Sequence, residues 1–225
     1  MSLLCQLATV SALQADMPAP ESWLGATERT RLSTLGTPAR RETFLAARWL
    51  ARRTVQRWRG SDRLPVLEVA PGGACRVVDP DGVFASISHS GDRVACAVAA
   101  VPVGVDIERL DRPRDHLAVA RAVHGEAQQQ ALLDLPPEDR ARHFLTLWTL
   151  KEAWLKARES GLDFAVMRSL AFDDVPDGDP DHDLATAEDG GFLLALAAVP
   201  ALPLEIVSSP ALSWRRCRAR RLAPD

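Results

Sequence analysis

Asp106 and Glu108 stand two positions apart in an otherwise apolar stretch, Val103-Gly-Val-Asp-Ile-Glu108. If this stretch is a β-strand, alternation of side chains places both carboxylates on one face and Val105 and Ile107 on the other. Neighbouring carboxylates repel each other unless a cation lies between them, and oxygen ligands without histidine or cysteine favour Mg²⁺ over zinc. The stretch therefore predicts a magnesium site, although an exposed strand with two ordinary acids would have the same sequence.

The only two lysines of the chain, Lys151 and Lys156, lie in one short segment, whereas every other cation among the 27 Lys+Arg is arginine. A general preference for arginine would leave the remaining lysines scattered. Their proximity indicates a local need for an ammonium group, which is a compact charge with an adjustable pKa. On a helix Trp148, Glu152 and Lys156 would share a face, and Lys151 would lie about 100° round from Glu152. A solvated Glu–Lys pair is the alternative, but arginine would serve that pair equally well.

A third polar group, Ser88-His89-Ser90-Gly91, precedes an apolar segment that begins at Val94. A Ser-His pair can indicate a hydrolase, but there is no G-x-S-x-G elbow, and neighbours in sequence rarely have triad geometry. We expect a turn whose hydroxyl, imidazole and backbone donors suit a phosphate, although a capped turn without a ligand would look the same. The three groups together are typical of Mg²⁺-assisted transfer or cleavage of a phosphoryl group.

Two pairs of similar segments indicate an internal duplication. Apolar residues at helical spacing, each followed by a run of small and branched apolar residues, predict two helices and two strands at 40–59, 144–158, 94–102 and 192–200. The offset between the pairs is about 100 residues in both cases, as in a repeat, although common apolar residues can also match by chance. We therefore expect an α/β (α+β) fold with a pseudo-two-fold duplication of two α/β halves, 1–102 and 103–225. The cleft between the halves is a natural ligand site.

The composition is that of an ordinary soluble globular protein, with 47% hydrophobic and 25% charged residues. A net charge of −3 gives no electrostatic argument for binding nucleic acid. The four cysteines are widely spaced, which favours free thiols in a reducing cytosol. We expect a cytoplasmic protein, because no signal peptide or membrane span is recognisable. The acidic stretch 173–183 and the basic stretch 214–221 are expected to be a solvated loop and a solvated terminus.

The three motifs resemble a known signature. Ser88-His-Ser, Gly104-Val-Asp-Ile-Glu108 and Trp148-x-x-Lys-Glu-x-x-x-Lys156 are similar, in order and spacing, to the motifs of 4′-phosphopantetheinyl transferases of the surfactin-synthetase-activating type. The resemblance extends over residues 40–170. It implies a monomer of two related α/β halves that transfers the phosphopantetheine arm of coenzyme A to a serine of an acyl or peptidyl carrier protein, releasing adenosine 3′,5′-bisphosphate.

The resemblance also implies roles for the acids and for one lysine. Asp106, Glu108 and Glu152 would hold Mg²⁺ against the pyrophosphate. Glu152 would accept the serine proton directly or through a water, a role that competes with metal binding. Lys156 would stabilise the pyrophosphate or shuttle a proton.

The contacts to coenzyme A follow from the same resemblance. His89 would bind the 3′-phosphate with help from Ser88 and Ser90, and Arg41 or Arg48 would be a further phosphate contact. Lys151 would contact a phosphate or acids of the partner.

One departure from the family pattern concerns the first half. Members commonly have Gly-Lys-Pro there, with the lysine on coenzyme A, but this chain has Pro71-Gly-Gly-Ala-Cys-Arg76. Arg76 or another arginine would have to substitute, or coenzyme A would bind more weakly. Carrier domains tend to be acidic, so a docking surface is expected at Arg112, Arg114 and Arg121. Two alternatives remain, namely a Mg²⁺-dependent phosphohydrolase acting on nucleotides and a catalytically silent carrier-binding module.

Overall fold

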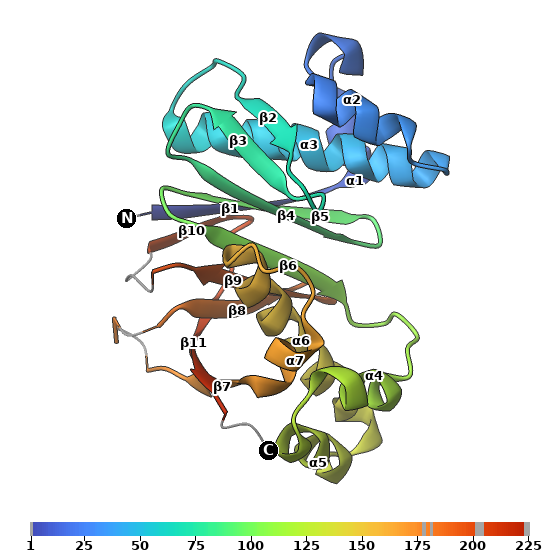
Figure 1. Ribbon diagram of the computed structural model, residues 1–225, viewed down its shortest axis with the longest axis vertical. Helices are drawn as coiled ribbons and strands as arrows, with labels where there is room; N and C mark the ends of the chain where they lie inside the picture. Colours follow the sequence, from blue (N-terminus) through green and yellow to red (C-terminus); the bar gives the residue numbers. More distant parts are fainter. Residues whose placement is uncertain (1, 177–178, 181, 201–204, 223–225) are drawn as a thin grey trace.

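The computed structural model describes residues 2–176, 179–180, 182–200 and 205–222. In the first half a long helix packs on one face of a mixed sheet (Figure 1). The elements of this half are β1 (Ser2–Thr9), α1 (Val10–Asp16), the 3₁₀ helix η1 (Pro20–Ser22), α2 (Ala26–Ser33), α3 (Pro38–Arg59), β2 (Val66–Val69), β3 (Cys75–Asp79), β4 (Phe84–Ser90) and β5 (Arg93–Ala99).

The second half repeats the motif of a long helix on a sheet. Its elements are β6 (Val103–Arg109), α4 (His116–Val123), α5 (Glu126–Asp134), α6 (Pro137–Ala157), α7 (Phe164–Ser169), β7 (Leu170–Asp174), β8 (Leu184–Asp189), β9 (Phe192–Ala198), β10 (Glu205–Ser209) and β11 (Arg215–Arg221). The sheet of this half has the order β6-β9-β8-β11-β7.

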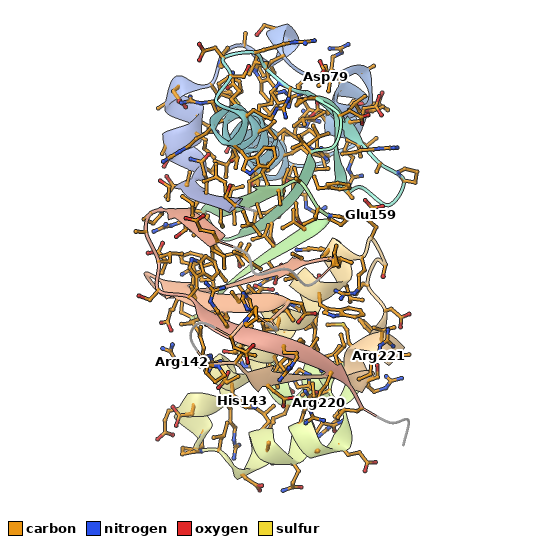
Figure 2. The ribbon with its side chains drawn as sticks, turned by 90° about the vertical axis from the view of Figure 1, so that its left-hand side faces the viewer. Asp79, Arg142, His143, Glu159, Arg220 and Arg221 are labelled. Carbon is orange, nitrogen blue, oxygen red and sulfur yellow. The ribbon has the colours of Figure 1, made fainter. Side chains whose placement is uncertain are left out.

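The two halves stack along the long axis of the molecule, with Asp79 in the first half and Arg220 in the second (Figure 2). Three apolar layers hold the stack together. One lies between α3 and the first sheet, one between the two sheets, and one between the second sheet and the helices around α6. The α+β fold with two similar halves, expected from the sequence, is confirmed.

One strand crosses between the halves. β10 comes from the C-terminal part of the chain but pairs in parallel with β1, with Leu3 opposite Ile206 and Cys5 opposite Ser208. The first sheet therefore has the order β10-β1-β5-β4. A division of the chain at residues 102 and 103 stays a prediction, because this strand adds residues from beyond it to the first sheet.

Two local expectations are wrong. The segment Ser88–Ser90 is the end of strand β4 rather than a turn, and the reversal follows at Gly91, whose φ is +58°. The basic stretch 214–221 is not a solvated terminus, because its residues form β11 between β7 and β8, where Cys217 is buried. Alternation in a strand allows this: small residues face the core while the arginines between them face outward.

The acidic stretch 173–183 includes residues outside the described ranges, but its described ends are not all a solvated loop. Asp173 and Asp174 belong to β7. Asp183 is buried and accepts a hydrogen bond from the Ala219 backbone N–H at 2.9 Å. All four cysteines are free thiols, as expected. Within the described residues no helix has the length and apolarity needed to cross a membrane.

The second half depends on very close packing of α6 against β6. A Cβ atom on Gly104 would lie 2.0 Å from the Ala153 carbonyl oxygen and 2.6 Å from the Ala157 backbone nitrogen. Both distances are far below van der Waals contact, and both neighbours are backbone atoms that cannot move away independently. Glycine on the strand and alanines on the helix therefore set the distance between the two elements.

We expect Gly104→Ala to lower the free energy of unfolding by about 3 kcal/mol or more, the upper end of the usual cost of over-packing a core. Urea denaturation followed by circular dichroism measures this change. Gly36→Ala is the matched control, since a Cβ there meets nothing within 4 Å. Equal stability of the two variants would show that the close packing does not constrain the fold.

Candidate active site

Strands β4 and β6 lie side by side where the two halves meet, although each is the edge strand of a different sheet (Figure 1). We call this pair the β4–β6 joint. It is bridged by serine hydroxyls from β4. The Ser88 hydroxyl donates to Asp106 Oδ1 at 2.8 Å, and the Ser90 hydroxyl donates to Glu108 Oε2 at 3.0 Å. The joint therefore combines residues from both halves.

The two acids of β6 lie on one face of the strand, as the alternation predicts. Val105 and Ile107 enter the apolar layer between the sheets, whereas Asp106 and Glu108 meet the serines. Both carboxylates are buried, with exposed fractions of 5% for Asp106 and 8% for Glu108. Burial of two like charges next to each other requires a compensating cation.

Lys156 supplies one such cation. Its Nζ lies 2.7 Å from Asp106 Oδ1, and it donates at 3.2 Å both to the Ser88 hydroxyl and to the Val105 carbonyl oxygen. The lysine is therefore held in the site by three oxygens, two of them on β6 and one on β4.

Glu152 lies one helical turn before Lys156 on α6 and is half-buried. Burial raises the pKa of its carboxyl to about 7, with Lys156 lowering it and Asp106 and Glu108 raising it. Near neutral pH this carboxyl is close to half-protonated, the state in which a group most readily takes up or gives a proton.

Arg114, which pairs with Glu108, also lies over the Trp148 ring, 5.8 Å from its centroid. Trp148, Glu152 and Lys156 thus share one face of the helix, as their spacing predicts.

The carboxylates of the joint fit a hard divalent cation in their chemistry. Asp106 Oδ2 is buried and has no hydrogen-bond partner among the residues that the structure describes. A buried oxygen without a partner is costly unless another group satisfies it. The neighbouring acidic groups are also carboxylates, which suit Mg²⁺. Among the described residues, no group of three His, Cys, Asp or Glu side chains is placed so that it could hold a metal ion. In this arrangement the Lys156 ammonium, rather than a third carboxylate, contacts Asp106.

Arg114 completes the charge balance and was not expected there. Its Nη2 lies 3.3 Å from Glu108 Oε1. The sequence analysis assigned Arg114 to a docking surface with Arg112 and Arg121. Those two side chains are exposed, but Arg114 is paired within the site. Arg114 differs from Arg112 and Arg121 because it contacts Glu108 on the strand that precedes its loop. The path of a loop cannot be read from the sequence.

His89 points away from the serine row. Alternation along β4 puts it on the opposite face from Ser88, and it retains solvent exposure. Partial burial lowers the pKa of its imidazole, as does Lys156, while Asp106 and Glu108 raise it. Ser88 and His89 are therefore not adjacent donors of one phosphate pocket in this structure.

The two arginine candidates for a phosphate contact differ in exposure. Arg41 is exposed, donates through Nε to the Leu35 carbonyl oxygen at 2.8 Å, and lines a surface cavity of about 430 Å³. Arg48 is 4% exposed and has internal partners, since it donates to the Glu68 carbonyl oxygen at 3.1 Å and lies 3.9 Å from Glu28. The geometry therefore favours Arg41 over Arg48 as a ligand contact.

Lys151 is not where the resemblance predicts. Its side chain is fully buried, and its Nζ donates to the Val123 carbonyl oxygen at 2.7 Å and to Gln128 Oε1 at 2.7 Å. The same atom lies 3.0 Å from His124 Nδ1. A side chain with no exposed surface reaches neither a phosphate nor a partner protein. Lys151 instead fastens α6 to the end of α4 and to α5.

Replacing Lys151 with methionine tests this buried role. Burial lowers the pKa of the folded Lys151 from 10.5 to about 7. Between these values the unfolded chain binds a proton that the folded protein does not bind. The lysine therefore makes the free energy of unfolding rise with pH, by up to about 1.4 kcal/mol per unit.

We expect the stability of the wild type, minus that of Lys151→Met, to increase from pH 7 to pH 9 in urea denaturation. Every other titrating group is common to both proteins, so the subtraction isolates this lysine. A difference that stays flat or falls with pH would mean that Lys151 is solvated.

Two family models match the chain, one on each half. The 4′-phosphopantetheinyl transferase superfamily model matches residues 102–196, and the 4′-phosphopantetheinyl transferase N-terminal domain model matches residues 29–100. The first match includes the acids of β6 and the whole of α6. The second includes both the helix and the serine strand of the first half.

Several curated relatives carry the same description. The 4′-phosphopantetheinyl transferase psf-1 of Bacillus pumilus is 40% identical over 81 residues, which are 36% of this chain and 34% of that protein. The transferase Sfp of Bacillus subtilis is 35% identical over 83 residues, 37% of this chain and 36% of that protein. The matched part thus spans about a third of the length of these relatives.

A putative 4′-phosphopantetheinyl transferase of Synechocystis is 27% identical over 152 residues, 65% of this chain and 61% of that protein. Among solved structures, the holo-[acyl-carrier-protein] synthase of Thermotoga maritima is 22% identical, with a TM-score of 0.33, and covers 43% of this chain and 61% of that one. That structural similarity is too low to support an argument. The two family models and the relatives agree, and the chain belongs to the 4′-phosphopantetheinyl transferase superfamily, with the N-terminal domain of its Sfp type.

Proposed function

We propose that this protein is a Mg²⁺-dependent 4′-phosphopantetheinyl transferase that modifies a serine of an acyl or peptidyl carrier protein. The observation that carries the proposal is the β4–β6 joint, where buried carboxylates, one of them with an unpartnered oxygen, face an ammonium. Membership of a family that generally uses Mg²⁺ and coenzyme A supports it.

In the proposed reaction the carrier serine oxygen attacks the phosphorus that bears the pantetheine arm. A new P–O bond forms to the serine, the pyrophosphate P–O bond breaks, and adenosine 3′,5′-bisphosphate leaves. Asp106, Glu108 and Glu152 would hold Mg²⁺, which supplies charge neutralisation for the pyrophosphate. Their negative charge and their position beside one another are the reasons for this assignment.

Glu152 is also the candidate to accept the serine proton, a role that competes with holding the cation. It would take the serine hydroxyl proton directly or through a water. Lys156 would donate hydrogen bonds to oxygens that gain charge as the leaving group departs, because its ammonium is a mobile point charge. Its present partner, Asp106, keeps the ammonium at the centre of the joint.

Binding of coenzyme A is assigned to the first half. Arg41 and His89 are exposed cation and imidazole donors for its 3′-phosphate, and Arg76, exposed on β3, is the candidate substitute for the missing Gly-Lys-Pro lysine. Arg112 and Arg121 are the exposed cations proposed to meet an acidic carrier domain. We also propose that the enzyme is cytoplasmic and that it acts as a monomer. The monomer is supported by the chain supplying both halves of the site.

The decisive experiment incubates the protein with coenzyme A, Mg²⁺ and an apo carrier domain, and then determines the mass of the carrier. We expect a gain of one phosphopantetheine group that disappears when Mg²⁺ is removed with EDTA. Asp106→Ala and Glu152→Gln should each reduce the rate at least about 100-fold, since removal of a general base alone costs about 10²–10⁴-fold.

Glu138→Gln is the matched control, because Glu138 is an exposed acid in the first turn of the same helix as Glu152. It should transfer at the wild-type rate. Free products without modified carrier would instead indicate a phosphohydrolase, and tight carrier binding without chemistry would indicate a silent binding module. Full activity in both site variants would refute the residue assignment.

Lys156→Arg tests whether an ammonium is required rather than a positive charge. Three oxygens converge on Nζ within 3.2 Å, a space that suits one small donor and not a planar guanidinium. We expect the turnover number to fall at least about 10-fold, while the melting temperature changes little. Turnover equal to that of the wild type would show that charge alone is sufficient.

A further inference from the structure

We propose that Ser88 and Ser90 are positioning residues that fix the two metal-binding carboxylates of β6 for the cation. This inference rests on the proposed function, because that function makes Asp106 and Glu108 metal ligands. It differs from the assignment that the family resemblance implies, in which Ser88 contacts a phosphate of coenzyme A. The evidence is the hydrogen bonding of the β4–β6 joint.

Serine hydroxyls bridge the joint along its length. Ser86, Ser88 and Ser90 alternate on the buried face of β4, with exposed fractions of 8%, 8% and 5%. The Val105 N–H donates to the Ser86 hydroxyl at 3.1 Å, and the Arg109 N–H donates to the Ser90 hydroxyl at 3.2 Å. Short hydroxyl side chains thus satisfy edge N–H groups of β6 that have no carbonyl of β4 to meet.

Ser88 and Ser90 bridge the strands and also donate hydrogen bonds to carboxylates. A hydroxyl has one proton to donate, and in Ser88 that proton is directed to Asp106 Oδ1 while the oxygen accepts from Lys156. Ser90 directs its proton to Glu108 Oε2 while its oxygen accepts from Arg109. Each serine therefore holds one carboxylate by one oxygen, and each hydroxyl has donated its only proton.

This arrangement leaves the other oxygen of Asp106 available. Asp106 Oδ2 is buried without a hydrogen-bond partner, whereas Oδ1 has two. A carboxylate that is already fixed through one oxygen loses less rotational freedom when the other oxygen binds a cation. Residues that orient metal ligands in this way typically change metal affinity 10–100-fold when they are removed.

The same geometry argues against a direct phosphate contact by Ser88. Its only proton is donated to Asp106, and Lys156 already donates to its oxygen. A phosphate accepts hydrogen bonds but donates none when ionised, so Ser88 has nothing left to offer it. Ser88 therefore acts through Asp106, and its effect should appear in metal affinity before it appears in coenzyme A affinity.

The test measures Mg²⁺ binding to the full-length protein by calorimetry, without coenzyme A or carrier. We expect Ser88→Ala and Ser90→Ala to weaken Mg²⁺ binding about 10–100-fold. Ser86→Ala is the matched control, since within the described part of the chain the Ser86 hydroxyl is hydrogen-bonded to a backbone N–H and to no carboxylate. It should bind Mg²⁺ within about twofold of the wild type. Ser88→Thr, which keeps the hydroxyl, should recover most of the affinity.

Coenzyme A affinity and thermal melting of each variant complete the experiment. Unchanged Mg²⁺ affinity in Ser88→Ala, with weakened coenzyme A binding, would overturn the proposal in favour of a phosphate contact. Equal loss of Mg²⁺ affinity in Ser86→Ala would overturn it in favour of a general effect on strand packing. A wild-type protein that binds no Mg²⁺ would overturn it as well.

Failure of the proposed function gives a different result. If the wild type binds Mg²⁺ but transfers nothing to the carrier, the transferase proposal fails, while the comparison among the serine variants still decides whether they position the carboxylates.

Discussion

The contact of α6 with β6 is the constraint on which the site depends. With no Cβ at Gly104, the helix backbone approaches the strand to a distance that no other residue would permit. Asp106 and Glu108 follow Gly104 on the same face of β6, so this approach sets how near Glu152 and Lys156 come to them. A methyl group at position 104 would push the helix away from the strand. The Lys156 ammonium would then move away from the Asp106 carboxylate, which it contacts at 2.7 Å. The close contact of α6 with β6 is therefore needed both for the packing of the core and for the geometry of the site.

Acidic and basic side chains are paired within the joint. Three acidic side chains gather there, and two cations, Lys156 and Arg114, are paired with the two acids of β6. The third acid, Glu152, responds by retaining its proton up to about pH 7, chiefly because it is buried. A divalent cation that entered would favour the ionised form of that carboxyl.

The sequence was most informative where one strand or one helix decided the geometry. Alternation in Val103–Glu108 correctly placed both acids on one face, and helical spacing correctly placed Glu152 with Lys156. The serine segment was misassigned to a turn because serine, histidine and glycine are common in turns. The alternation of Ser86, Ser88 and Ser90 opposite alternating acids was the signal that would have identified a strand.

Contacts between distant segments could not be predicted in this way. Nothing in the composition of β10 indicates that it pairs with β1, since a parallel pairing depends on a neighbour some two hundred residues away. The pairing of Arg114 with Glu108 likewise depends on the path of a loop. Residue types and spacings identified candidate groups for the proposed chemistry, but only the packing identified the partners of these groups.

Lys151 and Lys156 illustrate the same limit, because the sequence did not reveal their partners. Their contacts also explain why both residues are lysines. Each ammonium meets three acceptors: Val123 O, His124 Nδ1 and Gln128 Oε1 for Lys151, and Ser88 Oγ, Val105 O and Asp106 Oδ1 for Lys156. An ammonium has three N–H donors on one atom, whereas a guanidinium spreads five over a plane. Acceptors that converge on a point therefore select lysine even in a chain that otherwise uses arginine. The need for ammonium groups that the scarcity of lysine indicated stays a prediction. That scarcity could not reveal that one of them serves the proposed active site and the other the buried contact between helices.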